Sequence, residues 1–307
     1  MKIALCFIIS YNHILNKEDI WRKWIEPNKD IINVYFFYKD LQKIKSSWIL
    51  KHVVDPSFIK ETTYYHVVPA YLSVLSYAFQ NLNNQWFCLL TESCCPIISP
   101  KKFRSLFYRN YNLSIMNWRK AWWNVDLQKR ANLFQLPEKF HLANDPYFIL
   151  KREDVSYCFQ FTHKYHSLYK LICDGGLANE SLFVIIMFIY KRLDKFKKKV
   201  THLTDWSRMT SPTSPYLFIN GTDKDKMFIE NGLKDHPCAI FIRKISPDFP
   251  DNILIDFIYN KTNINVEISS YTSTITFFTI ILFIHCFLFY CLYDNFSEKM
   301  GFLCFLF

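Results

Sequence analysis

The sequence predicts an α/β protein with a mostly parallel sheet. Half of the 307 residues are hydrophobic, which is enough to bury a sizeable core. Short apolar runs alternate with segments of helical spacing, as in βαβ units. The runs are continuously apolar, which is typical of parallel strands that are buried on both faces. The chain has only 5 Gly against 30 Phe and 19 Tyr, which argues against a glycine-rich phosphate-binding loop.

The first predicted strand covers residues 2–9. This run is too short for a signal peptide, and the polar segment Ser10-Tyr11-Asn12-His13 follows it without a cleavage site. Buried apolar or β-branched runs predict the later strands, and apolar residues at helical spacing predict the helices. We expect strands at residues 31–38, 48–54, 86–90, 147–150, 216–219 and 238–242, and helices at 20–25, 66–82 and 181–190.

A hydrophobic segment lies near the end of the chain. Residues 272–292 are 21 consecutive residues without a charge, enough helix to cross a bilayer core of about 30 Å. The alternative is a buried terminal helix, because several Thr residues and His285 lower the hydrophobicity on which the prediction of a membrane span rests. We expect a globular domain at 1–250, a linker at 251–271, a single membrane span at 272–292 and a short tail at 293–307. The flanking charges leave the orientation and the identity of the membrane open.

The net charge of +10 suits a polyanion, an anionic membrane surface or a phosphorylated substrate equally well. The basic run at residues 191–199 ends a predicted helix, where solvated cations complement the helix dipole, so we expect no nucleic-acid partner. No C-x-x-C pair occurs, and no histidine has zinc-finger spacing from a cysteine. Asp223-Lys224-Asp225 has the D-x-D spacing of a manganese site but comes late in the chain, and we interpret it as a solvated loop.

Four blocks in the chain follow a recognisable order. They are W-F-C-L-L-T-E-S-C-C-P-I at 86–97, Y-F-I-L-K-R-E-D-V at 147–155, A-N-E-S-L-F at 178–183, and T-D-W-S at 204–207 followed by C-A-I-F-I-R-K-I-S-P at 238–247. In this order they resemble the core-2/I-branching β-1,6-N-acetylglucosaminyltransferase family, in particular its plant branch. The resemblance covers about residues 2–250.

This resemblance implies a glycosyltransferase A-type fold, the Rossmann-like fold of nucleotide-diphospho-sugar transferases. It implies an inverting enzyme that moves a sugar, N-acetylglucosamine, from a UDP-sugar to a hydroxyl of a glycan or glycoprotein acceptor, without a metal or another cofactor. Transferases that use UDP-xylose share the same blocks and remain an alternative. A membrane-anchored binding protein without turnover is another, because the blocks depart from the family at Asp145-Pro146 and Asn179.

Two roles in the chemistry follow from the matched blocks. Inverting transfer needs one general base for the acceptor hydroxyl, and the resemblance assigns this role to Glu180. We expect Glu180 to open a helix, where the dipole favours its ionised form. The leaving diphosphate needs a cation, for which Arg243 and Lys244 match. Adjacent strand residues point to opposite faces, so we expect only one of Arg243 and Lys244 to reach the diphosphate. Arg208 is a further candidate for binding the diphosphate.

Further residues are expected to bind substrate. Asp40 ends a block that is similar to the family's I-Y-x-H-x-D, whose aspartate accepts a hydrogen bond from uracil. Glu92 and Ser93 follow a predicted strand and should emerge at the carboxyl edge of the sheet, where open α/β sheets bind ligands. Tyr147 begins the second matched block, and we include it among the substrate-binding residues.

Overall fold

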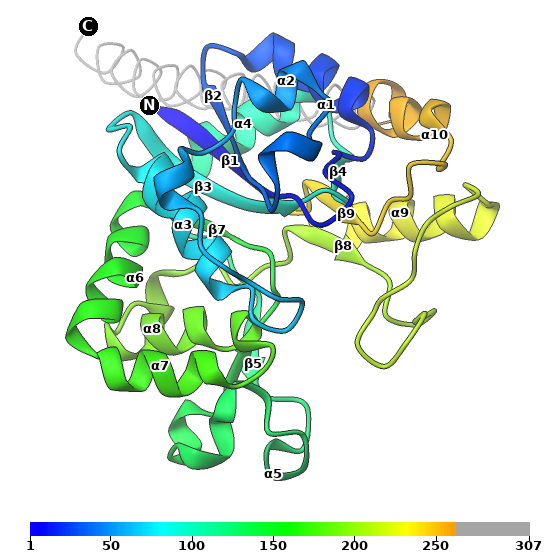
Figure 1. Ribbon diagram of the computed structural model, residues 1–307. Coiled ribbons are helices and arrows are strands. Elements are labelled where there is room, and N and C mark those ends of the chain that lie inside the picture. The colour runs from blue at the N-terminus through cyan, green and yellow to red at the C-terminus, as the bar shows by residue number, and fades with distance from the viewer. Residues whose placement is uncertain (262–307) are drawn as a thin grey trace, which may run out of the picture. The chain divides into compact units, whose positions relative to one another are not determined.

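A computed structural model describes residues 1–261 of the chain. Its centre is a four-stranded sheet of order β2-β1-β3-β7 (Figure 1). The strands are β1 (Lys2–Ile8), β2 (Ile32–Phe37), β3 (Asn84–Thr91) and β7 (Ile149–Lys151). β1 pairs in parallel with β2 and β3, whereas β7 runs antiparallel to β3. The α/β class and the mostly parallel sheet are therefore confirmed.

Helices cover both faces of this sheet, which explains why most residues of its strands are apolar. Adjacent strand residues point to opposite faces, so Trp86 and Phe87 identify the two layers. Phe87 packs against Phe79, and Trp86 packs against Phe107, with ring centroids 6.1 and 5.6 Å apart. One layer is made by α3 (Val68–Phe79) and α6 (Arg152–Lys164), and the other by α1 (Glu18–Ile25) and α4 (Pro100–Asn110).

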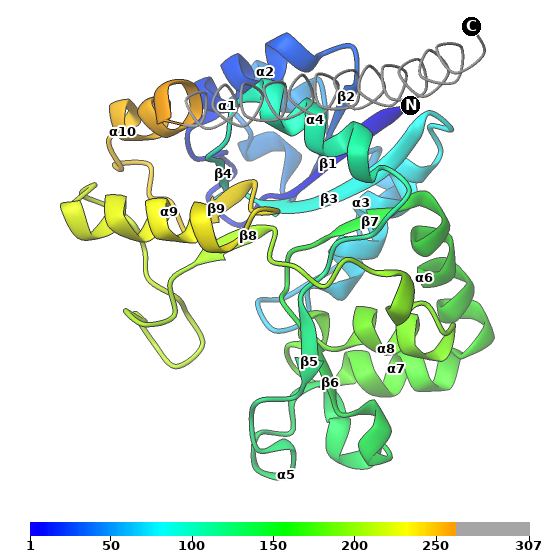
Figure 2. The same cartoon turned by 180° about the vertical axis from the view of Figure 1, so that it is seen from behind.

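A smaller sheet begins where β3 ends. Its strands are β4 (Cys95–Pro96), β8 (His202–Thr204) and β9 (Phe241–Arg243), with β9 in the centre. β9 is antiparallel to β4 and parallel to β8. Because only a short turn separates β3 from β4, this sheet extends the carboxyl edge of the main sheet, as both views show (Figures 1 and 2).

The remaining elements are short. A hairpin pairs β5 (Trp118–Lys120) with β6 (Leu142–Asn144). The other α-helices are α2 (Ser47–Leu50), α5 (Val125–Gln128), α7 (His166–Asp174), α8 (Leu182–Ile189), α9 (Asp223–Asp235) and α10 (Asp251–Ile255). Turns of 3-10 helix are η1 (Glu26–Asn28), η2 (Leu41–Lys43), η3 (Pro56–Phe58), η4 (Arg130–Gln135), η5 (Glu138–Phe140), η6 (Ala178–Glu180) and η7 (Leu193–Lys195), and a π-helical segment spans Asp256–Lys261.

Two predicted strands are wrong. At residues 48–54 the chain begins as α2, because the Ser46 hydroxyl caps this helix by accepting a hydrogen bond from Ile49 N at 3.1 Å, and only Val53 forms a bridge, with Phe36 of β2. At residues 216–219 only Phe218 forms a bridge, with Ile245. The helices α4, α6, α7 and α9 lie outside the predicted set. They carry many polar residues, which obscured their periodicity.

The segment Asp223-Lys224-Asp225, expected in a solvated loop, forms the first turn of α9. Thr222 and Asp225 make a capping box there, in which each side chain bonds the other's backbone N–H. The Asp225 carboxylate is fully buried and accepts a hydrogen bond from Arg208 at 2.8 Å, whereas the Asp223 side chain is 91% exposed. Asp225 therefore completes the capping box of α9, in which Thr222 is the N-cap residue, and pairs with a cation.

We expect Asp225→Ala to lower the free energy of unfolding by about 1–3 kcal/mol, because it leaves buried donors without an acceptor. The matched control is Asp223→Ala on the same turn, which should stay within about 0.5 kcal/mol of the wild type. Denaturant unfolding of the full chain measures both values. Equal effects of the two substitutions would contradict the assignment of Asp225 to the capping box.

The basic run at residues 191–199 is not uniformly solvated as expected. Arg192 is buried and donates to Asp154 at 2.9 Å and to Glu153 at 2.7 Å. Asp154 also accepts a hydrogen bond from the Ser114 hydroxyl at 2.5 Å. Arg192 thus belongs to a buried network that joins η7 to α6.

Residues Met1–Ile258 form one compact unit. Leu254, Phe257 and Ile258 are buried in it, so the unit extends past residue 250, where the sequence predicted the domain to end. Within residues 1–261, no helix combines the length and apolar character needed to cross a bilayer. The predicted span Thr272–Leu292 lies outside the described residues.

Candidate functional site

A cavity of about 390 Å³, here called the edge cavity, opens at the carboxyl edge of the main sheet. Ser10 and Asn12 follow β1 at this edge, and Glu92 and Ser93 follow β3. Parallel neighbouring strands end at the same edge, which is why residues so far apart in sequence meet here. The positions predicted for Glu92 and Ser93 agree with this arrangement.

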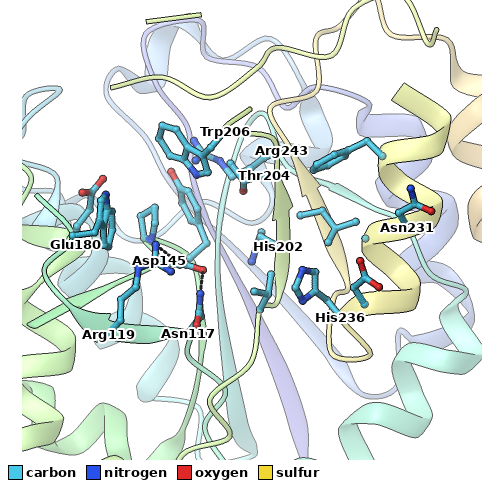
Figure 3. Close-up of a pocket in the computed structure, with 18 residues that line it drawn as sticks. Asn117, Arg119, Asp145, Glu180, His202, Thr204, Trp206, Asn231, His236 and Arg243 are labelled. Atoms are coloured by element: carbon cyan, nitrogen blue, oxygen red, sulfur yellow. Dashed lines mark hydrogen bonds and ion pairs between the residues drawn. The ribbon is translucent and has the colours of Figure 1, made fainter. Parts of the chain in front are cut away.

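A second cavity of about 410 Å³, here called the α9 cavity, lies between the β5–β6 hairpin and α9 (Figure 3). Asn117 and Asp145 stand on the hairpin side, and Asn231 and His236 on the α9 side. α9 approaches β8 closely at Gly232, where a Cβ atom would lie 2.6 Å from a Leu203 methyl group. A larger residue at position 232 would therefore require α9 or the Leu203 side chain to shift.

The two cavities share a wall. Tyr147, Glu180, Trp206 and Arg243 line both of them. Glu180 also lines a third cavity of about 300 Å³ together with Arg119 and Arg130. A ligand in either of the two larger cavities would therefore lie beside Glu180.

Glu180 ends η6 and is fixed by residues distant in the sequence. The side chain of Asn144 in β6 donates a hydrogen bond to the carbonyl of Asn179 at 3.0 Å. It also accepts one from the backbone N of Val184 at 3.2 Å, and thereby caps the N-terminus of α8. The Glu180 carboxylate accepts a hydrogen bond from Arg130 at 3.2 Å. Its side chain is only 13% exposed.

The electrostatic setting of Glu180 differs from the expected one. Glu180 precedes α8 and is separated from it by Ser181, so it does not occupy the first turn of that helix. Burial raises the pKa of Glu180 above its ordinary value, while Arg130 and Arg243 act in the opposite direction. The net rise is a correction to the prediction that the helix dipole favours the ionised form. It moves the carboxyl toward the range in which a general base works best.

Arg243 ends β9 beneath both cavities. Its guanidinium lies 4.2 Å from the ring centroid of Tyr147, and the residue is buried. Within the described part of the chain Arg243 forms no salt bridge, and its Nε has no hydrogen-bond partner. A buried guanidinium that makes no direct ion pair favours an anionic ligand.

Lys244 lines the edge cavity beside Arg243, and the expectation that only one of them reaches the diphosphate stays a prediction. The alternation of a strand does not extend to Lys244, because β9 ends at Arg243. Lys244 Nζ donates to the Ser214 hydroxyl at 2.7 Å. Burial and, next, the charge of Arg243 lower the pKa of Lys244. Two adjacent cations therefore face one cavity.

The other predicted residues divide into two groups. Glu92 accepts a hydrogen bond from the Ser10 hydroxyl at 2.7 Å, and Ser93 lies 3.2 Å from the Thr91 hydroxyl, both within the edge cavity. Asp40 lies outside the residues that line the two larger cavities. It caps η2 by accepting from Gln42 N at 3.0 Å.

Arg208, the further candidate for the diphosphate, is engaged elsewhere. It donates to Asp205 at 2.6 Å and to Asp225 at 2.8 Å, and its guanidinium lies 3.9 Å from the ring centroid of Tyr216. Arg208 is absent from the linings of both larger cavities. Its ion pairs with the two carboxylates hold the segment after β8 against α9, and its Nη2 is buried without a hydrogen-bond partner.

Sequence reasoning missed Arg130 and His202. Arg130 reaches Glu180 from η4, which lies in no matched block, so nothing in the sequence indicates the pairing. His202 lies two residues before the T-D-W-S block, and a histidine in a short strand carries no signal by itself. Within the described residues, no group of three or more His, Cys, Asp or Glu side chains is arranged to hold a metal ion.

The site thus combines a ligand-sized cavity at the carboxyl edge of the sheet, the largely buried carboxylate of Glu180 and two adjacent basic residues, Arg243 and Lys244. The family model for the core-2/I-branching enzyme matches residues 33–229, more than half of the chain. The chain belongs to this family, which is a family of glycosyltransferases. Glu180 lies inside the matched range, while Arg243 and Lys244 follow it. No curated protein matches the chain.

Proposed function

We propose that this chain is an inverting glycosyltransferase of the A-type fold that moves N-acetylglucosamine from UDP to a glycan hydroxyl without a metal. The observation that carries the proposal is the position of Glu180 in the wall between two cavities, one of which contains Arg243 and Lys244. The family membership supports the sugar and the acceptor class. The parallel order of β1, β2 and β3, with a cavity at their carboxyl edge, supports the fold.

In this proposal the UDP-sugar occupies the edge cavity. Arg243 and Lys244 bind the diphosphate and stabilise the negative charge that develops as the bond between the anomeric carbon and the phosphate oxygen breaks. Arg243 and Lys244 thereby supply the positive charge that a divalent ion supplies in metal-dependent enzymes.

The acceptor occupies the α9 cavity, from which its hydroxyl reaches Glu180. Glu180 removes the hydroxyl proton while the acceptor oxygen forms its bond to the anomeric carbon. The products are the elongated glycan and UDP, and the proton remains on Glu180 until solvent takes it. Burial keeps the pKa of Glu180 raised, which makes the carboxylate a stronger base than an exposed one.

A panel of UDP-sugars tests this function. Binding is measured by calorimetry and transfer by release of UDP, both with EDTA present. We expect UDP-N-acetylglucosamine to bind and to be turned over in EDTA. Stronger binding of UDP-xylose would identify the pentose as the transferred sugar instead. If no UDP-sugar binds, the proposal is contradicted.

A substitution of Arg130 tests how Glu180 is held. The charge of Arg130 lowers the pKa of Glu180 against the effect of burial, so we expect Arg130→Met to raise that pKa. Because the base must be ionised, the acid limb of the profile of kcat/KM against pH should move to higher pH. Arg130→Lys keeps the charge and should leave the limb close to its wild-type position. An unchanged profile in Arg130→Met would show that the contact is not functional.

A further inference from the structure

His202 of β8 lies at the centre of the α9 cavity, between the wall that carries Asn117 and Asp145 and the wall formed by α9 (Figure 3). Its ring is held between Tyr147 and Phe241, with centroids 5.5 and 5.0 Å away. The residue is 6% exposed, and its Nε2 has no hydrogen-bond partner. Buried polar atoms without a partner are uncommon, so this one requires an explanation.

The neighbouring Thr201 determines which nitrogen carries the proton. The Thr201 hydroxyl donates to the carbonyl of Tyr147 at 3.3 Å, because a carbonyl can only accept. Its oxygen lies 2.9 Å from Nδ1 of His202 and therefore accepts the Nδ1 proton. This leaves a lone pair on Nε2, so the unpaired atom is a hydrogen-bond acceptor.

The ring is neutral at physiological pH. Burial, and next the positive charge of Arg243, hold the pKa of His202 well below its ordinary value. A neutral Nε2 with a free lone pair requires a donor, which an anion lacks and a hydroxyl provides.

The rest of the α9 cavity suits a sugar ring. Asn117, Asn231 and Asp235 offer hydrogen-bonding groups on two sides. Trp122 and Trp206 line the same cavity and are 50% and 43% exposed, so each offers a flat apolar surface. Aromatic surfaces combined with a few polar groups are typical of small-molecule sites, and a pyranose has both an apolar face and hydroxyl groups.

We propose that Nε2 of His202 accepts a hydrogen bond from a hydroxyl of the acceptor sugar in the α9 cavity. This inference rests on the proposed function, which places the acceptor there. The sugar of the donor has the same chemistry and is the other source of such a hydroxyl. Because the proposed function places the donor in the edge cavity, where Lys244 lies beside Arg243, the acceptor is the source we assign.

Two substitutions of His202 test the contribution of its Nε2 atom to binding. His202→Asn keeps a polar group near Nδ1 and removes the acceptor at Nε2, whereas His202→Gln places an amide oxygen near the position of Nε2. Thermal unfolding of both full-length variants checks that they fold like the wild type. The probes are the methyl glycosides of β-galactose and β-N-acetylglucosamine, with binding followed by saturation-transfer NMR in the presence of UDP.

We expect His202→Asn to lose about tenfold in affinity for the bound methyl glycoside, the scale of one lost hydrogen bond. His202→Gln should lose much less, and both variants should bind UDP-N-acetylglucosamine like the wild type. Equal affinity in the wild type and His202→Asn would overturn the proposal, as would a loss confined to UDP-N-acetylglucosamine, which would assign His202 to the donor sugar. If the wild type binds UDP-N-acetylglucosamine but neither glycoside, the inference fails while the proposed function stands. If it binds no UDP-sugar, the proposed function itself fails.

Discussion

Replacing Glu180 with glutamine should lower the rate of transfer by about 10²–10⁴-fold, the contribution of a positioned general base. Glutamine has the same shape as glutamate and can still contact Arg130, but it cannot take a proton. The affinity for the UDP-sugar should stay within a few-fold of the wild type, because Arg243 and Lys244 are unchanged. Single-turnover transfer and calorimetric titration of UDP measure the two quantities separately.

The control for this experiment is Glu138→Gln. The side chain of Glu138 is 81% exposed and pairs with the exposed Lys120, so this variant should keep the wild-type rate. Near-normal turnover by Glu180→Gln would remove Glu180 from the mechanism. A loss of UDP binding in that variant would instead show that the carboxylate shapes the edge cavity.

Replacing Lys244 with alanine should weaken UDP binding by about 1.5–3 kcal/mol, the scale of a hydrogen bond to a charged group. This corresponds to a loss in affinity of about 10- to 150-fold. Lys244 is half-buried beside Arg243 in the edge cavity, where charge is less screened than in water. Calorimetry with UDP, and with uridine as the ligand without phosphates, measures the effect. Uridine binding should not change.

Ser214→Ala serves as the control for Lys244→Ala. It removes the hydrogen bond that Lys244 makes in the described structure but leaves the ammonium group in place. UDP affinity should then be unchanged or slightly stronger. If Lys244→Ala binds UDP normally, the diphosphate is held by Arg243 alone, because Arg208 is already paired with Asp205 and Asp225.

The sequence predicts the parts of the site that follow directly from a strand. Glu92 and Ser93 come after an apolar strand, and the carboxyl edge of a parallel sheet collects such residues wherever they occur in the chain. Glu180, Arg243 and Lys244 were found through the matched blocks. The structure then places all of these residues around connected cavities.

The other parts depend on tertiary contacts that local patterns do not contain. Arg130 meets Glu180 only because η4 and η6 pack together, and no periodicity reports such a pairing. Asp225 has the spacing of a metal ligand in sequence, yet it is buried, pairs with Arg208 and completes a helix capping box. The raised pKa of Glu180 likewise follows from burial by distant residues.

The position of β9 in the centre of the smaller sheet has a consequence for the synthesis of the protein. The main sheet has all four strands once Lys151 has been made, but Arg243 and Lys244 come much later. At a translation rate of about 5–20 residues per second, roughly 5–20 s separate the two events. During this interval the nascent chain already contains Glu92 and the edge of the main sheet but lacks both cations. Under the proposed function, a ribosome-bound chain therefore lacks both cations of the donor site until β9 has been made.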